Sequence, residues 1–157
     1  MNTTLRVGAL VLCIAGALGS ALPAAAARQG PGTFDRTPGF LKRAELALEE
    51  GRLDRAVGLI LPRMGLLRRS TDKHLANSTL CSAQLRLENL QMAAEACAVA
   101  VQSEYATWSD LNNLGVYHYA MGDFDAALSW FEQAAAVDPK RKDVQTNIEA
   151  AMVAIQR

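Results

Sequence analysis

The chain has 157 residues, of which 50% are apolar and 6% aromatic, with 16 basic and 16 acidic side chains. A chain of this length suggests one compact domain at most. Its high alanine content and scarcity of aromatic residues favour packed helices over a sheet. The balanced charge provides no general attraction to a polyanion, so we expect no nucleic-acid partner.

Charge is distributed unevenly along the chain. Residues 28–73 hold ten bases and six acids, whereas residues 74–157 hold five bases and ten acids. Two short basic clusters stand out, Arg68-Arg69 and residues 140–142. Each is either a contact surface or ordinary solvated surface, and the first is placed to meet anionic lipid or an acidic partner.

Residues 1–27 have the parts of a secretory signal peptide. Arg6 supplies a positive charge, and residues 7–22 form an uncharged apolar stretch. That stretch is shorter than the ~20 residues that a membrane-spanning helix needs. We therefore expect cleavage after Ala26 or Ala27 and a periplasmic mature chain without a membrane span. The alternative is an uncleaved membrane anchor.

Residues 28–39 contain two prolines and three glycines. This composition excludes a regular helix or a central strand. We expect a flexible leader here, followed by one helical domain over residues 40–157.

Residues 108–139 form the clearest structural unit. Apolar residues recur at helical spacing in two stretches that are separated by Gly122 and Asp123. Gly122 can take the left-handed conformation that ends a first helix, and Asp123 can cap the second. Pro139 disfavours helical geometry at Asp138. The segment is therefore predicted to be two antiparallel helices.

This unit resembles a tetratricopeptide repeat (TPR) along its whole length. The small residues Gly115 and Ala127 lie where two helices must approach closely, and Leu114 and Phe131 are large where the gap must be filled. The positions that match the family's pattern are Leu111, Leu114, Gly115, Gly122, Phe124, Ala127, Phe131, Ala134 and Pro139. The family's aromatic residue on the first helix is shifted here, to Tyr117 and Tyr119.

A second unit is predicted at residues 74–104, because Ala93 precedes Ala127 by the TPR period of about 34 residues. It lacks a turn glycine, so Asn89, which tolerates the left-handed region, is expected at the turn.

A third, weaker unit spans residues 37–70. Ala56 precedes Ala93 by more than the TPR period, so about one helical turn is inserted, and Pro62 should kink or end the second helix early. Residues 142–156 carry apolar side chains at helical spacing and are predicted to cover the last repeat. The expected fold is all-α, with three antiparallel hairpins and a capping helix. The TPR resemblance implies a right-handed superhelical array whose first helices line a concave groove.

The mature chain carries two cysteines, Cys81 and Cys97, on the two helices of the second unit. Each lies eight residues from the turn near Asn89. In an antiparallel pair, equal distances from the turn place two residues at the same level, so a disulfide is geometrically plausible, and the periplasm would permit it. The alternative is two free, buried cysteines that act as small apolar residues.

Signals for chemistry are absent from the sequence. The histidines, His74 and His118, belong to no metal-binding pattern, and there is no nucleophile elbow, phosphate loop or dinucleotide fingerprint. His118 falls on the packed stripe, where we expect a hydrogen-bonded core residue. We predict no enzymatic activity, no cofactor and no metal.

The resemblance implies a groove that binds another protein, expected to be an extended or helical segment of an envelope protein. Tyr119, Leu85 and Arg86 are the predicted anchors, because aromatic residues and arginine dominate binding hot spots. The alternatives are a self-associating homo-oligomer of the envelope and a non-catalytic accessory subunit. The predicted groove residues are Leu75, Ser78, Ser82, Leu85, Arg86, Ser109, Asn112, Asn113, Val116 and Tyr119.

Overall fold

A computed structural model describes residues 37–157. The predicted signal peptide, 1–27, and residues 28–36 of the predicted leader lie outside the described residues. Over the described range the chain forms seven α-helices, one 3-10 helix and no strand, which confirms the all-α prediction. The α-helices are α1 (Gly39–Glu49), α2 (Leu53–Ile60), α3 (Ser70–Arg86), α4 (Leu90–Val101), α5 (Trp108–Ala120), α6 (Phe124–Val137) and α7 (Lys142–Ile155).

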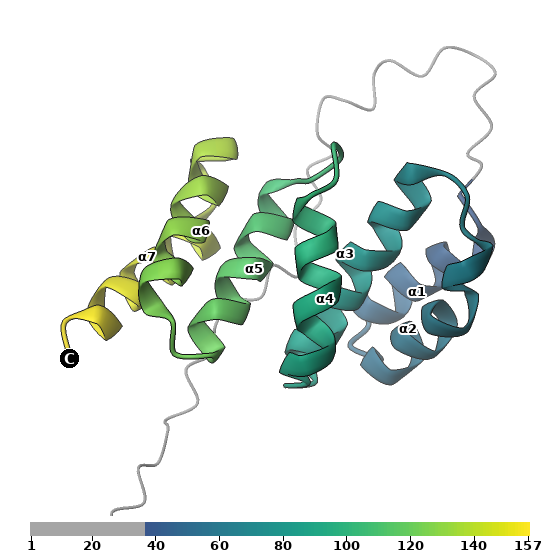
Figure 1. Ribbon diagram of the computed structural model, residues 1–157, viewed down its shortest axis with the longest axis horizontal. Helices are drawn as coiled ribbons and strands as arrows, with labels where there is room; N and C mark the ends of the chain where they lie inside the picture. The colour runs from purple at the N-terminus through teal and green to yellow at the C-terminus, as the bar shows by residue number, and fades with distance from the viewer. Residues whose placement is uncertain (1–36) are drawn as a thin grey trace, which may run out of the picture.

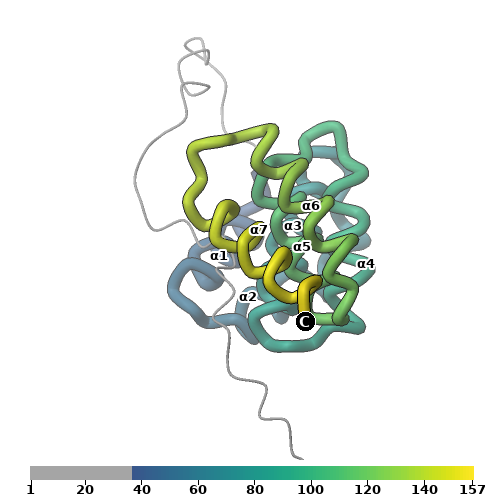
Figure 2. Tube along the Cα trace, turned by 90° about the vertical axis from the view of Figure 1, so that its left-hand side faces the viewer, coloured from purple at the N-terminus to yellow at the C-terminus, as the bar shows by residue number. Residues whose placement is uncertain are grey.

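The helices form three hairpins that follow one another along the long axis, with α7 at the far end (Figures 1 and 2). Within the hairpins, α1 packs on α2, α3 on α4 and α5 on α6, and α7 packs on α6. Successive first helices also contact one another, α1 with α3, α3 with α5 and α5 with α7. The prediction of three hairpins and a capping helix is therefore confirmed, while the right-handed sense of the array stays a prediction.

The three hairpins turn through a left-handed residue at corresponding positions. These residues are Gly51 (φ 73°), Glu88 (φ 57°) and Gly122 (φ 81°). The prediction that Asn89 fills this role is wrong, because Asn89 has a φ of −87° and is the N-cap of α4. The spacing explains the difference, since Glu88 and not Asn89 lies one full repeat before Gly122.

Small residues mark the contact between helices in each hairpin. Ala56, Ala93 and Ala127 are 0% exposed, as the repeat spacing predicts. In the third hairpin the approach is close at Gly115, where an added Cβ would lie 2.5 Å from the ring of Phe131 and 3.2 Å from the carbonyl oxygen of Ala127. Such a contact leaves no room for a larger side chain.

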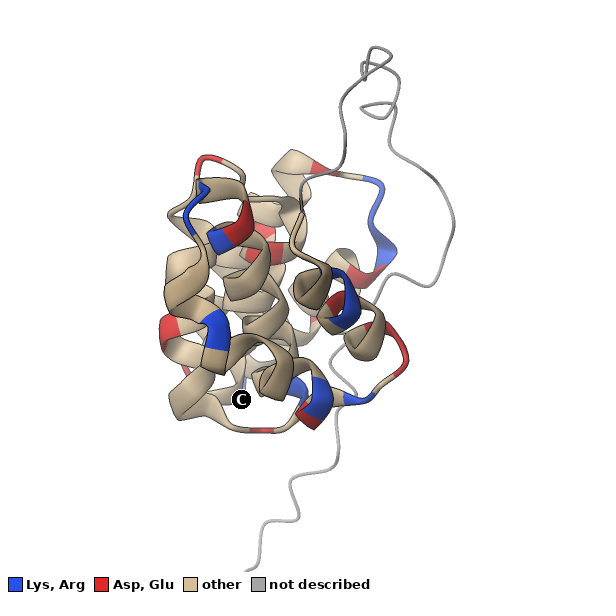
Figure 3. Ribbon diagram, turned by 90° about the vertical axis from the view of Figure 1, so that its right-hand side faces the viewer, with Lys and Arg blue, Asp and Glu red and all other residues tan. Residues whose placement is uncertain are grey.

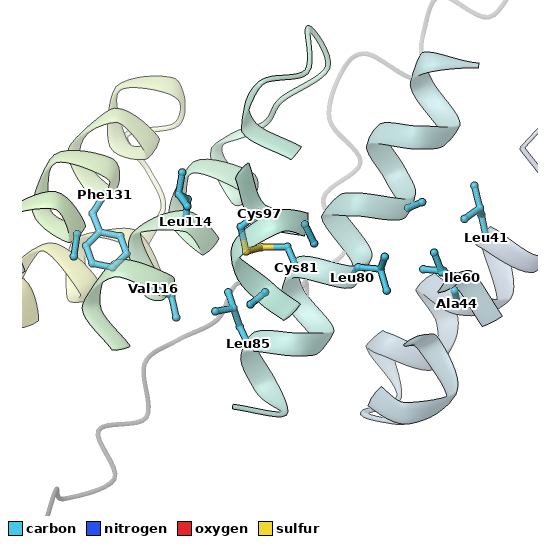
Figure 4. Packing of buried hydrophobic residues seen from close by; sticks show 14 of the residues in the cluster. Leu41, Ala44, Ile60, Leu80, Cys81, Leu85, Cys97, Leu114, Val116 and Phe131 are labelled. Carbon is cyan, nitrogen blue, oxygen red and sulfur yellow. A yellow bond between two sulfur atoms is a disulfide. The ribbon is translucent and has the colours of Figure 1, made fainter. Parts of the chain in front are cut away.

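Cys81 and Cys97 are joined by a disulfide, with their sulfurs 2.05 Å apart and their Cα atoms 4.8 Å apart. Both residues are 0% exposed. The bond lies inside the second hairpin, in the middle of the row of buried side chains (Figure 4). The predicted pairing therefore has the geometry that it needs.

The first hairpin departs from the other two after Ile60. There α2 ends, and a 3-10 helix, η2 (Leu61–Leu66), follows with Pro62 in its first turn. This confirms that Pro62 ends the second helix early, since its ring and its missing N–H do not fit a helix interior. At the other end of the hairpin, α1 begins at Gly39, the last residue of the predicted leader, with Pro38 as its N-cap.

Replacing Glu88 with glycine should stabilise the protein. A residue with a Cβ pays about 1–2 kcal/mol in the left-handed region, and glycine does not. Allowing for the greater freedom of glycine in the unfolded chain, we expect the free energy of unfolding to rise by about 0.5–1 kcal/mol. Chemical denaturation measures it. The matched control is Asn89→Gly, which should gain nothing, and equal effects of the two variants would contradict this account of the turn.

Reduction should raise the mass of the protein by about two daltons, which is the signature of one disulfide. Replacing both cysteines, Cys81→Ala/Cys97→Ala, should lower the free energy of unfolding by about 3 kcal/mol, because the bond closes a loop of this length. Reductant should destabilise the original protein and leave the double variant unchanged. A mass that does not respond to reductant would show two free thiols instead.

Candidate functional site

The residues predicted to line a groove fall into two groups in the structure. The buried group, none more than 7% exposed, is Ser82, Leu85, Asn112, Asn113 and Val116. The group with open surface is Leu75, Ser78, Arg86, Ser109 and Tyr119. Residues of the buried group are not part of an open surface, so the lining predicted from the sequence has to be reduced to the second group.

The buried amides of α5 connect the first helices to one another. Asn113 donates from Nδ2 to Oγ of Ser82 on α3, at 2.8 Å. On the other side, Asn147 of α7 donates from Nδ2 to Oδ1 of Asn112, at 2.9 Å. Buried polar groups are costly unless they are hydrogen-bonded. These side chains therefore hold the array together, a role that the predicted groove pattern did not indicate.

A second polar contact joins the starts of α3 and α5. Nε2 of His74 lies 3.5 Å from Oδ2 of Asp110. The same oxygen accepts from the backbone N–H of Thr107 at 2.8 Å, which makes a capping box at the start of α5. The ring of Tyr105 lies beside that of His74, with 6.2 Å between centroids. No group of three or more potential metal ligands occurs anywhere in residues 37–157.

His118 is not the core residue that the sequence pattern suggested. Its side chain is 27% exposed, and Nδ1 lies 3.5 Å from Oδ2 of Asp123. The stripe of buried residues on α5 ends at Val116, so the last turn of the helix approaches solvent. Asp123 is the predicted N-cap of α6, and its side chain accepts from the backbone N–H of Ala126.

Arg86, a predicted anchor, has a structural partner. Its Nη1 donates to the backbone oxygen of Leu48 at 2.9 Å. This oxygen belongs to the last turn of α1, where helix carbonyls lack partners within the helix and a cation is favourable. The arginine thus connects the first hairpin to the second, with one of its N–H donors directed within the chain.

The start of α7 is fixed by Arg141. Its guanidinium carbon lies 3.8 Å from the ring centroid of Trp108, at the first residue of α5. Nε and Nη2 donate to the two carboxylate oxygens of Asp143 at 3.1 and 3.0 Å. The hydrogen bond to Asp143 raises the pKa of Arg141, so the stacked group is cationic at any physiological pH.

A hollow of ≈ 280 Å³ opens between α5 and α7. Tyr119 lies at its α5 side, and the rest of its lining comes from α7 and from Arg157, which follows that helix. Val153 is 50% exposed there. The α7 residues that line the hollow are Thr146, Glu149, Ala150, Val153 and Ala154, and Arg157, just after the helix, completes the lining.

Charges of opposite sign flank the apolar part of this lining. Glu149 lies four residues before Val153 on the same face of α7, and Arg157 follows two residues after the end of the helix. Neither charge forms an ion pair with another described residue. The sequence indicated Tyr119 but not the α7 residues, because residues 142–156 were interpreted as a cover. One signal in the sequence was available: residues 142–156 carry more apolar side chains than a single buried helix face needs.

The chain also matches a known family over part of its length. Residues 108–141 match the model of the tetratricopeptide repeat, which covers α5, α6 and the turn before α7. No curated protein and no solved structure matches the chain significantly. The family match and the helical hairpins together support a repeat protein of the TPR type, a class that generally binds other proteins and is generally not catalytic. Across residues 37–157, every helix is too short or too polar to cross a membrane.

Proposed function

We propose that the protein is an exported, periplasmic adaptor that binds a helical or extended segment of another envelope protein and catalyses no reaction. The observation that carries the proposal is the hollow between α5 and α7, lined by Tyr119 and Val153. Aromatic and aliphatic side chains in a concave site are typical anchors for a peptide or helix. The TPR-type fold supports the same class of partner.

The chemistry of the hollow narrows the kind of segment that fits. Val153 and the two alanines beside it, Ala150 and Ala154, offer an apolar floor, and Tyr119 offers an aromatic wall. Glu149 and Arg157 supply opposite charges on either side. A complementary segment therefore carries one or two apolar side chains, flanked by a basic residue on one side and an acidic residue on the other.

The two helices around the hollow are held in place before a partner arrives. The bond between Asn147 and Asn112 joins α7 to α5 in the middle, and Arg141 stacks on Trp108 at the end. A preformed site loses less conformational entropy on binding than one that must be ordered. This rigidity supports specific recognition in the hollow.

Export is supported by the sequence of residues 1–27, with its basic start, uncharged apolar stretch and alanine-rich end. We expect the protein in the periplasmic fraction with an N-terminus at Ala27 or Arg28. Cell fractionation and N-terminal sequencing test this. Interrupting the apolar stretch with Val11→Asp should retain the full-length chain in the cytoplasm. An intact Met1 on the periplasmic protein would contradict cleavage.

Site-specific photocrosslinking in intact cells tests the adaptor role. A photoreactive residue at position 153 should capture one envelope protein, because Val153 lines the hollow. Position 99 is the matched control, since Val99 is also an exposed valine (43% against 50%) but lies on α4. Adding Tyr119→Ala should reduce capture from position 153 about tenfold, as expected for loss of an aromatic anchor.

Two results would contradict the adaptor role. Equal capture from positions 153 and 99 would show that the hollow does not select the partner. A product with twice the mass of the chain would identify a second copy as the occupant, which is the self-association alternative.

A further inference from the structure

The first hairpin carries a projection that the other two hairpins lack. The separation of Ala56 from Ala93 exceeds that of Ala93 from Ala127 by about one helical turn, and the additional length lies in η2 and the turn that follows. No acidic residue occurs between Asp54 and Asp72. The inserted segment is therefore purely basic in its charge.

Leu66 is the most exposed large apolar side chain of the described residues, at 68%. The next residue, Leu67, is extended and only 3% exposed, so it fixes the segment to the core. Leu66 and Arg68, the residues on either side of it, are both exposed, so both side chains point away from the core. In a 3-10 helix, residues three apart eclipse one another, so Arg63 lies on the same side as Leu66.

These three residues, Arg63, Leu66 and Arg68, are the leucine–arginine patch. Arg63 is held in place, because its Nη1 donates to the backbone oxygen of Leu59 at 3.1 Å and its guanidinium lies 5.8 Å from the centroid of the Phe40 ring. The patch therefore presents a leucine between two arginines on a segment that is fixed at both ends.

The surroundings of the patch leave its positive charge uncancelled. Asp72, the nearest acid in the sequence, is bonded through both carboxylate oxygens to Arg69, at 3.0 and 2.7 Å. Arg68 and Lys73 are exposed and pair with no acid in the part of the chain that the structure describes. Figure 3 views the molecule from the end where the first hairpin lies.

We infer that the leucine–arginine patch docks the protein on an anionic membrane surface, with Leu66 inserted among the lipid chains and the arginines at the lipid phosphates. Cations near an anionic bilayer are attracted to it, and an apolar side chain gains by entering the interface. Two arginines and one leucine give a weak, reversible and salt-sensitive attachment.

A membrane fits this patch better than an acidic protein does. Protein interfaces are centred on a cluster of apolar side chains that fill pockets in the partner. Here a single leucine projects between two cations from a short turn of helix. A bilayer accepts such an isolated side chain without a pocket, and arginine forms bidentate hydrogen bonds with phosphate.

Vesicle sedimentation tests the inference on the protein purified from cells. Its mass is measured first, to establish whether the predicted signal peptide is still present. Vesicles of phosphatidylglycerol and phosphatidylcholine in equal parts are compared with pure phosphatidylcholine. Binding to the pure phosphatidylcholine vesicles measures any contribution of the apolar residues 7–22, if the signal peptide is retained. We expect about twenty-fivefold stronger binding to the anionic vesicles, lost in 0.5 M salt, because each of the two arginines near the surface contributes a factor of about five.

Variants locate the contact. Arg68→Glu and Leu66→Ser should each weaken anionic binding at least tenfold, given the effect of each cation and of burying a leucine. The matched controls are Lys140→Glu and Val137→Ser, which change an exposed cation and a 59% exposed valine next to the turn before α7. Both controls should bind within about twofold of the original protein, as surface charges and side chains far from the membrane do. Thermal unfolding verifies that every variant is folded.

Three outcomes would overturn the inference. Equal binding to both kinds of vesicle would exclude an anionic surface as the target. Equal loss from Arg68→Glu and Lys140→Glu would show that net charge, and not the patch, governs binding. Binding of a glutamate-rich peptide that Arg68→Glu abolishes, without binding to anionic vesicles, would assign the patch to an acidic protein.

Discussion

The array depends on one close contact that is repeated inside each hairpin. It lies between the middle of the first helix and the middle of the second. In the third hairpin the pair is Gly115 and Phe131, where a glycine admits an aromatic ring. The equivalent positions one repeat earlier hold Cys81 and Cys97, which are covalently bonded. In the first hairpin, one longer repeat before those, the pair is Ala44 and Ile60, next to each other and 0% exposed.

These three pairs are different solutions to the same packing problem. Each combines a small residue on the first helix with a group that reaches it from the second, and all of these residues are buried. A glycine facing a phenylalanine, an alanine facing an isoleucine and a disulfide all fill a similar volume between two helices. The helices of the second hairpin carry no aromatic residue at this position. The disulfide holds them close together instead.

The fold was predictable because its determinants are local and periodic. The spacing of Ala56, Ala93 and Ala127 located the hairpins, and Pro62 located the irregular segment after α2. The left-handed residue of the second hairpin was misplaced by one position, because residue type suggested Asn89 while the repeat spacing indicated Glu88. At residue 88 the position in the repeat determines the left-handed backbone conformation, and glutamate adopts it although the residue type does not favour it.

The candidate site was less predictable, because a residue's position in the TPR pattern does not determine whether its side chain is exposed to solvent. Asn112 and Asn113 look like polar groove residues in sequence, yet their partners lie on α7 and α3, and only the packing of the hairpins brings them together. Tyr119 keeps open surface and its role as an anchor stays a prediction, but the hollow beside it needs α7, whose inward and outward faces are both partly apolar. Periodicity identified the buried face of α7 and gave no information about the other.

The need for a small residue at the centre of each first helix also restricts which helices can pack on α7. The position in α7 that lies one repeat after Gly115 is occupied by Glu149. A further helix packed on α7 in the way that α6 packs on α5 would enclose this carboxylate without a partner, at a cost of several kcal/mol. Packing a further helix on α7 in this way would therefore require glycine or alanine in place of glutamate at residue 149.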